Sequence, residues 1–232
     1  TYTTTNYKND DMKDVDAIKD ALREIKKKKD KLEEELDAVR DKGEEEKDVK
    51  ENLAQLEKER KEQRDALPSA LAKLHFYGEY VQIRKELDYL YHVNYIKERQ
   101  LWQDTVVKTV VLRNDPQRVP WIVYTCGAMG AGKGYTMRWM SSLNIFPLES
   151  VVRIDPDHFK SVMPEWEGYL SRDKKNGTFN AGGFCHRESG YIQEICQEVA
   201  LRSRQNIWVD GSLRDGDWFS KVFDDIRKRF PY

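Results

Sequence analysis

The chain has 232 residues, with 40 Lys and Arg against 41 Asp and Glu, so its formal net charge is −1. Charged residues make up 35% of it, above the roughly 25% of an ordinary globular protein, and hydrophobic residues only 39%. The near-zero net charge argues against a general nucleic-acid surface, and no apolar stretch is long enough to span a membrane.

Cysteine usage and the chain ends indicate the compartment. Cys126, Cys185 and Cys196 are too widely spaced to form a metal or disulfide pattern, which favours a reducing, cytoplasmic interior. The first residues lack the layout of a signal peptide. Because the chain starts without Met and stops at Tyr232, we expect it to be a piece of a longer protein.

The N-terminal third predicts a disordered segment over residues 1–11, followed by a charged coiled coil over 12–67. About two thirds of Asp11–Asp65 is charged, and no aromatic residue lies between Lys8 and His75. Apolar residues nevertheless recur at steps of three and four, in two frames, which is typical of a coiled coil; they are Ile18, Leu22, Ile25, Leu32, Leu36 and Val39, then Val49, Leu53, Leu56 and Leu67.

Gly43 lies where these two frames disagree. It is either a stutter in one long helix or the turn of a helical hairpin. The alternative to a coiled coil is a single solvated helix held by Glu–Lys pairs. A coiled coil predicts either a coiled-coil protein partner or self-association, in a tether or docking rod, with a cytoskeletal assembly as one setting.

Residues 68–114 form an aromatic-rich region that we predict to be helical, from Leu71 to Val111. Its rings alternate with basic residues, which in principle suits stacking on nucleic acid. Acidic neighbours such as Glu79, Glu86 and Asp88 cancel that basic field. We therefore expect the rings to pack against the next domain or a partner. A linker with two prolines follows, over residues 115–120.

From residue 121 to 232 the pattern alternates strand, loop and helix, which predicts an α/β domain of the P-loop kinase type with a parallel sheet and flanking helices. Three strands are readable, at residues 121–126, 151–154 and 206–210. Amphipathic helices follow at helical spacing; their apolar faces are Ile192, Ile195, Cys196, Val199 and Ala200, and Phe219, Val222, Phe223, Ile226 and Phe230. Three strands make an incomplete sheet.

The stretch GAMGAGKG, residues 127–134, matches the phosphate-loop pattern G-x-x-x-x-G-K between a predicted strand and a helix over Tyr135–Leu143. Its glycines let backbone amides turn toward phosphate oxygens, and its lysine reaches the β- and γ-phosphates. The alternative is a glycine-rich turn with an incidental lysine. The predicted nucleotide-binding residues, for ATP with Mg²⁺, are Gly127, Gly130, Ala131, Gly132, Lys133, Gly134 and Tyr135.

Gly134 departs from that pattern, because the position after the lysine normally carries a hydroxyl that binds Mg²⁺. Thr136 lies further round the helix and does not simply replace it. The sequence thus offers no direct metal ligand in the loop. Mg²⁺ would be held through phosphates and water, with Asp210 as a candidate partner. The alternative is a site that binds nucleotide without efficient turnover.

The acceptor side is expected at the carboxyl ends of the other strands. Of Asp155 and Asp157 we expect one to cap the following helix and the other to act as the base that takes the acceptor proton. The segment His186–Ser189 is expected to open the next helix, after a glycine-rich loop that includes Gly182. Asp210, at the end of the third strand, either holds Mg²⁺ through water or hydrogen-bonds acceptor hydroxyls. Arg187 and Arg214 are candidate anion contacts that could instead form surface ion pairs.

Four spaced motifs carry a resemblance: GAMGAGKG, RIDPDHFK, HRES and WVDGSLRD. With them, residues 121–232 resemble the zeta-toxin family of P-loop kinases, and more closely the zeta-toxin domains of larger eukaryotic proteins. The resemblance implies ATP-dependent phosphorylation of a small acceptor, as the bacterial toxins phosphorylate UDP-N-acetylglucosamine on its sugar 3′-hydroxyl. It implies Lys133 and Asp157 as catalytic residues, and substrate contacts from Asp157, Arg187, Glu188, Asp210, Ser212 and Arg214.

The family's later strands and its lid arginines would lie after Tyr232. Two hypotheses therefore stay open. One is a kinase module carried on a coiled coil. The other is a catalytically degenerate nucleotide-binding module in a filament or large assembly. A polynucleotide or nucleoside kinase would also need the phosphate loop, but the acidic strand ends do not supply its basic acceptor groove.

Overall fold

The computed structural model describes residues 7–42, 47–111, 115–128, 130–175, 177 and 180–231. The chain divides into two compact units. The helical unit comprises Lys8–Phe76 and Asp88–Ile96. The α/β unit comprises Tyr77–Leu87 and the residues from Lys97 onward, together with Tyr7.

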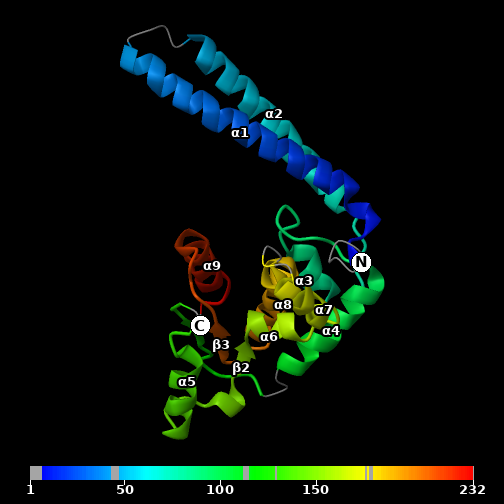
Figure 1. Cartoon of the computed structure of the whole chain (residues 1–232), viewed down its shortest axis with the longest axis vertical. Coiled ribbons are helices and arrows are strands. Elements are labelled where there is room, and N and C mark those ends of the chain that lie inside the picture. Colours follow the sequence, from blue (N-terminus) through cyan, green and yellow to red (C-terminus); the bar gives the residue numbers. More distant parts are fainter. Residues whose placement is uncertain are drawn as a thin grey trace. The chain divides into compact units, whose positions relative to one another are not determined.

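A helical hairpin dominates the helical unit (Figure 1). A 3-10 turn, η2 (Asp10–Met12), leads into α1 (Lys13–Lys42), and α2 (Lys47–Leu71) packs against α1 along its length. Lys29 of α1 pairs with Glu57 of α2 at 2.5 Å between Nζ and Oε1. Of the two alternatives for this region, the hairpin is therefore the one that the structure shows. Gly43 itself lies outside the described residues.

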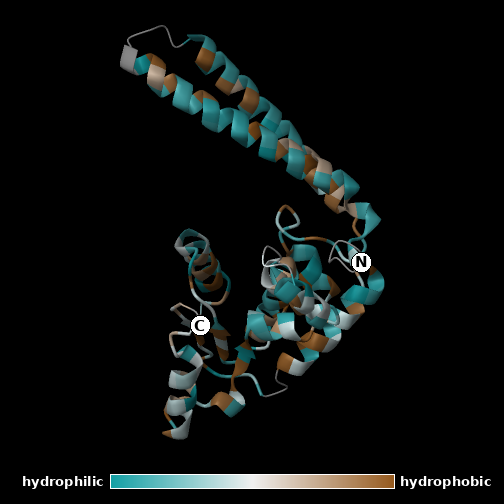
Figure 2. Cartoon of the chain, in the orientation of Figure 1, coloured by the Kyte–Doolittle hydropathy of each residue, from teal (hydrophilic) through white to brown (hydrophobic). Residues whose placement is uncertain are grey.

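Apolar residues at the expected spacing form the inner face of the hairpin. Ile18, Ile25 and Leu56 are each 7% exposed, whereas the positions between them are mostly charged and exposed. Figure 2 shows the corresponding brown stripes along two otherwise teal helices. Exposed ion pairs on the outer face, such as Arg23–Asp20, add little, because the charges are solvated. Burial of the stripe therefore supplies most of the stability of the hairpin.

The region after the hairpin is less helical than its sequence predicts. Pro68 lies inside α2, which ends at Leu71. Within 72–111, helices form only at α3 (Val81–Glu86) and α4 (Lys97–Val110). The prediction of a helix throughout is therefore wrong for residues 72–80 and 87–96. In the helical unit, residues 88–96 form turns and irregular structure, and the ring centre of Tyr89 lies 5.4 Å from that of Phe76, which precedes α3.

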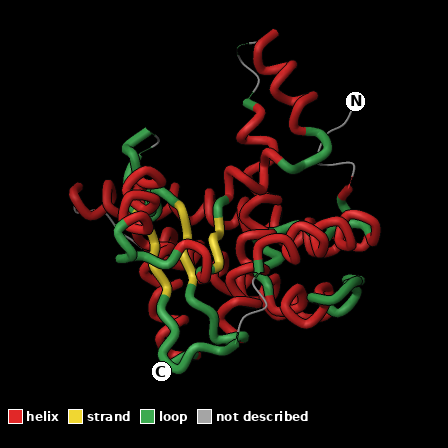
Figure 3. Tube along the Cα trace, turned by 90° about the horizontal axis from the view of Figure 1, so that it is seen from below, coloured by secondary structure: helices red, strands yellow, loops and turns green. Residues whose placement is uncertain are grey.

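Among the described residues, a three-stranded parallel sheet forms the centre of the α/β unit (Figure 3). Its strands are β1 (Ile122–Thr125), β2 (Val152–Ile154) and β3 (Ile207–Asp210), in the order β1-β3-β2. Each lies within one residue of the predicted strand. The α/β fold class with a parallel P-loop kinase-like sheet is thus confirmed, and the carboxyl ends of all three strands meet at one edge.

Helices cover both faces of this sheet. On one face Trp208 packs with Met137 of α5 (Lys133–Ser142) and with Phe146, before the short turn η3 (Leu148–Ser150). On the other face lie α8 (Ala181–Arg202) and α9 (Gly216–Arg229), and the Tyr124 ring lies 4.9 Å from Phe223 of α9. The apolar faces predicted for α8 and α9 are the buried or half-buried ones. Among the described residues, no helix is long and apolar enough to cross a membrane.

α4 is held in the α/β unit by a buried polar cluster. Arg99 donates from Nε to Glu188 of α8 at 2.6 Å and from Nη1 to Glu165 at 3.0 Å. Gln103 of α4 also donates to Glu188, at 2.8 Å. The side chains of all three charged residues are at most 3% exposed. The two remaining helices, α6 (Pro156–Ser161) and α7 (Trp166–Lys175), pack on α8 as well.

Candidate functional site

The loop between β1 and α5 has the backbone of a phosphate-binding loop. Gly130 and Gly132 have φ angles of +78° and +82°, in the left-handed region that side-chain-bearing residues rarely adopt. Gly132 is the residue that precedes the first turn of α5. The unpaired amides of that turn therefore face the loop, which favours an anion there. Met129, inside the same loop, lies outside the described residues.

Lys133 lies across this loop. Its Nζ donates hydrogen bonds to the carbonyl oxygens of Gly127, at 3.0 Å, and Ala128, at 3.2 Å. Ala131, whose amide donates to the carbonyl of Ala128 at 3.2 Å, closes the turn. The ammonium group is thus held by weak neutral acceptors, which phosphate oxygens can replace with charge-assisted hydrogen bonds.

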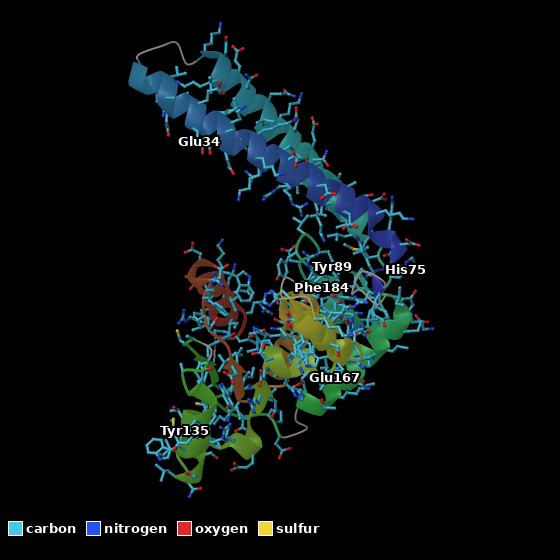
Figure 4. The ribbon with its side chains drawn as sticks, in the orientation of Figure 1. Glu34, His75, Tyr89, Tyr135, Glu167 and Phe184 are labelled. Carbon is cyan, nitrogen blue, oxygen red and sulfur yellow. The ribbon has the colours of Figure 1, made fainter. Side chains whose placement is uncertain are left out.

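The next residues of α5 confirm that the loop provides no hydroxyl beside the lysine. Gly134 has no side chain, and Thr136 donates its hydroxyl to the carbonyl of Gly132 at 3.2 Å. Tyr135 is 69% exposed, with its ring on the outside of α5 (Figure 4). The described residues of the loop therefore fit a polyphosphate but offer Mg²⁺ no direct side-chain ligand.

Of the two carboxylates after β2, Asp155 caps α6. Its Oδ1 accepts the amides of Asp157, at 3.0 Å, and His158, at 3.3 Å. The Asp157 side chain is 75% exposed and its Oδ1 lies 2.9 Å from Nζ of Lys160. The structure thus leaves the carboxylate predicted as a base accessible to a ligand from solvent.

Asp210, at the end of β3, lies beside Thr125, the last residue of β1, two positions before the phosphate loop begins. Its Oδ1 accepts the hydroxyl of Thr125 at 3.1 Å, and Asp210 and Thr125 are register partners on β3 and β1. Ser212 and Arg214 follow on an exposed loop, where the Ser212 carbonyl accepts the Cys126 thiol at 3.6 Å. The sheet therefore brings Asp155, Asp210 and the phosphate loop to one edge.

The α8 candidates are placed differently from the expectation. α8 begins at Ala181, so His186–Ser189 lies inside the helix, and Gly182 and Gly183 belong to its first turn rather than to a covering loop. Arg187 is exposed. The Glu188 carboxylate is fully buried and bound to Arg99 and Gln103, so its observed role is to hold α4 on α8.

Burial keeps two of the three thiols neutral. It raises the pKa of the Cys185 thiol to about 11, with a further rise from the charge of Glu188, and it raises the pKa of Cys196 as well. A neutral, buried thiol is a poor nucleophile and metal ligand. Cys185 and Cys196 are therefore structural residues.

Arg153 and Arg99 are the contacts that sequence reasoning missed. Arg153 stands in the motif RIDPDHFK, two residues before Asp155, and therefore projects from the same face of the chain. That spacing was the available signal for the ion pair between them, which measures 2.9 Å. The Arg99 pairs span 66 and 89 residues, and no local pattern indicates them.

A strand that ends in a glycine-rich loop, a helix that begins at its lysine and a parallel sheet define a P-loop kinase-like module. The family model described as Zeta toxin matches residues 105–229, which is 125 of the 232 residues. The chain belongs to the zeta toxin family. The resemblance seen in the four motifs is thereby confirmed, and with it the P-loop, nucleotide-binding, kinase-like character of the module.

The chain is similar to one solved structure from a study of the PezAT chromosomal toxin-antitoxin system of the human pathogen Streptococcus pneumoniae. It aligns with a TM-score of 0.45 and 19% sequence identity, over 56% of this chain and 51% of that chain. The alignment thus spans about half the length of that protein. No curated protein matches the chain.

Proposed function

We propose that the α/β unit binds ATP and transfers its γ-phosphoryl group to a hydroxyl group of a small acceptor. The observation that carries the proposal is the loop from Gly127 to Lys133, in which glycines of positive φ and a lysine surround a helix N-terminus. The family supports ATP with Mg²⁺ as cofactors. A UDP-sugar as the acceptor class is our proposal from the resemblance of the four motifs. The proposed domain runs from residue 121 to 232, after the linker at 115–120.

In this proposal Lys133 leaves the carbonyls of Gly127 and Ala128 and binds the β- and γ-phosphate oxygens. Asp157 accepts the proton of the acceptor hydroxyl as the oxygen attacks phosphorus. Asp210, Ser212 and Arg214 orient the acceptor, together with Arg187. Mg²⁺, held through the phosphates and through water on Asp210, would neutralise phosphate charge. Glu188 is left out of the proposed acceptor site, because its carboxylate is buried and bound to Arg99.

Two variants test the proposal, with ATP binding followed by isothermal titration and transfer followed with UDP-N-acetylglucosamine as acceptor. Lys133→Met should abolish ATP binding, because the loop loses its only side-chain cation. Asp157→Asn should retain ATP binding and lower transfer about 10²–10⁴-fold, the usual contribution of a general base. Lys174→Met, at an exposed position of α7, is the matched control. Normal transfer by Asp157→Asn would contradict the assignment of the base.

Gly134 favours a second candidate, a nucleotide-binding structural module without turnover. In that case wild-type protein binds ATP but transfers no phosphate to any acceptor.

For either candidate we propose that the helical hairpin, within the proposed coiled-coil region 12–67, docks a helical protein partner or a second copy. The three free thiols support a reducing, cytoplasmic location.

A further inference from the structure

Arg153 of β2 is held in a fixed direction by the sheet. Its Cα pairs in register with that of Trp208 on β3, and its guanidinium lies 4.7 Å from the centre of the indole ring. The Trp208 side chain is 1% exposed and packed among Met137, Phe146 and Val151. The guanidinium therefore rests on a rigid aromatic surface, where a cation–π contact is favourable.

Two carboxylates share this guanidinium. Its Nη2 donates to Oδ2 of Asp155 at 2.9 Å and lies 3.6 Å from Oδ2 of Asp210. The side chains of Asp155 and Asp210 are 22% and 17% exposed, so water screens them only in part. Without the arginine, these two negative charges would face each other across neighbouring strands.

Each of the two carboxylates has a second partner near the proposed chemistry. Asp155 accepts the backbone amide of Asp157, in the first turn of α6. Asp210 accepts the hydroxyl of Thr125, the last residue of the strand before the phosphate loop. A continuous series of polar contacts thus crosses all three strand ends, and Arg153 is its central member.

We propose that Arg153 is a positioning residue for phosphoryl transfer. By holding Asp155 and Asp210 together, it fixes the first turn of α6, and with it Asp157, relative to the phosphate loop. The inference rests on the proposed function, in which Asp157 is the base. Transfer requires the base and the phosphate to be held within a fraction of an ångström of the productive geometry, which is why a residue without substrate contact affects the rate.

The first test compares Arg153→Met, which keeps the stem but loses the charge, with Arg153→Lys and with Arg172→Met, at an exposed position of α7. With ATP and UDP-N-acetylglucosamine, kcat should fall about 10–100-fold in Arg153→Met, while KM for ATP stays within about twofold. Arg153→Lys should recover part of kcat, and Arg172→Met should match wild type. An unchanged kcat in a folded Arg153→Met protein would overturn the proposal.

The second test needs no turnover. Amide hydrogen exchange at Asp157 and His158 reports whether the Asp155 carboxylate is still held in place, and Ile195 inside α8 serves as the reference amide. Exchange at Asp157 and His158 should accelerate about tenfold in Arg153→Met, with no change at Ile195. If wild type transfers no phosphate and this acceleration occurs, the proposed function fails, and what stands is only that Arg153 holds the Asp155 carboxylate on the first turn of α6. Unchanged exchange at both amides overturns it.

Discussion

A single glycine separates this phosphate loop from the usual pattern. Gly134 follows the lysine where other loops carry a Mg²⁺-binding hydroxyl. A Cβ atom built there would meet only the mobile end of Arg138, 3.4 Å away, so the backbone has room for a side chain. Sterically, the missing hydroxyl is therefore not forced by the fold.

We predict that Gly134→Ser increases the Mg²⁺-dependent part of ATP affinity about tenfold, the scale on which one group near a metal changes its binding. The hydroxyl would occupy the usual metal-ligand position at the start of α5. Isothermal titration with ATP, with and without Mg²⁺, measures the difference.

The matched control is Gly168→Ser on α7, where a Cβ atom meets nothing within 4 Å and no ligand is expected. Both substitutions add a hydroxymethyl group to a helix, so an effect common to both reflects helix propensity. An equal Mg²⁺ response in wild type and Gly134→Ser would show that the ion is held without this position.

At the residue scale, the sequence was informative wherever chemistry is local. Lys133 and its glycines were predictable, because the loop is formed by consecutive residues. The cap by Asp155 was one of two alternatives, since Asp157 is also near the helix start. The resemblance implies that Glu188 contacts an acceptor, whereas its observed partner is Arg99, 89 residues away. Burial and long-range pairing decide that role, and neither is visible in a motif.

Among the elements, α4 carries a buried network of ion pairs in the α/β unit. Arg99 contacts two buried carboxylates, and its guanidinium also stacks on Trp102, 4.2 Å from the ring centre. The pKa of Arg99 is raised, although burial alone would lower it, because its hydrogen bonds to Glu188 and Glu165 outweigh desolvation. The arginine is therefore charged throughout the accessible pH range.

We predict that Arg99→Met destabilises the protein by about 3–5 kcal/mol, because it leaves buried carboxylates without their cation. Urea unfolding followed by far-ultraviolet circular dichroism provides the free energy of unfolding. Arg172→Met, at an exposed position, should change it by less than about 0.5 kcal/mol. A loss below about 1 kcal/mol for Arg99→Met would mean that water or other groups replace the guanidinium.

The strands were predictable because a short apolar run followed by glycine or acidic residues, in an alternating α/β pattern, is typical of a strand. The structure of residues 72–96 was not predictable from the sequence. Its aromatic residues follow helical spacing, but there the chain divides between two units, and Gly78 adopts a φ of +87°. Tertiary packing against different neighbours overrides the local preference.

At the scale of the whole molecule, none of the proposed catalytic or ligand-binding residues lies in the helical unit. The inner face of the hairpin depends instead on residues such as Ile25, which is 7% exposed. We therefore expect the stability of the hairpin and the binding of nucleotide to be separate properties of this chain.

We predict that Ile25→Asp lowers the stability of the helical unit by about 2–5 kcal/mol, since it replaces buried apolar volume by a charge. Affinity for ATP should stay within about twofold of wild type. Thermal melting followed by circular dichroism measures the first quantity and isothermal titration the second.

Lys26→Asp places the same carboxylate at the neighbouring exposed position and should leave both quantities near wild type. A large loss of ATP affinity in Ile25→Asp alone would show that the hairpin supports the nucleotide site.

The anchoring of α4 has a practical consequence for dissecting this protein. The linker with two prolines is an obvious position at which to truncate the chain. A fragment that starts there loses Arg99 and Gln103 but keeps their partners Glu165 and Glu188, whose carboxylates are both buried. It also loses the whole buried ion pair of Arg84 with Asp104, 2.7 Å apart in the same unit, because both residues precede the linker. A fragment that keeps these contacts accordingly starts no later than Tyr77, well ahead of the first motif by which its family is identified.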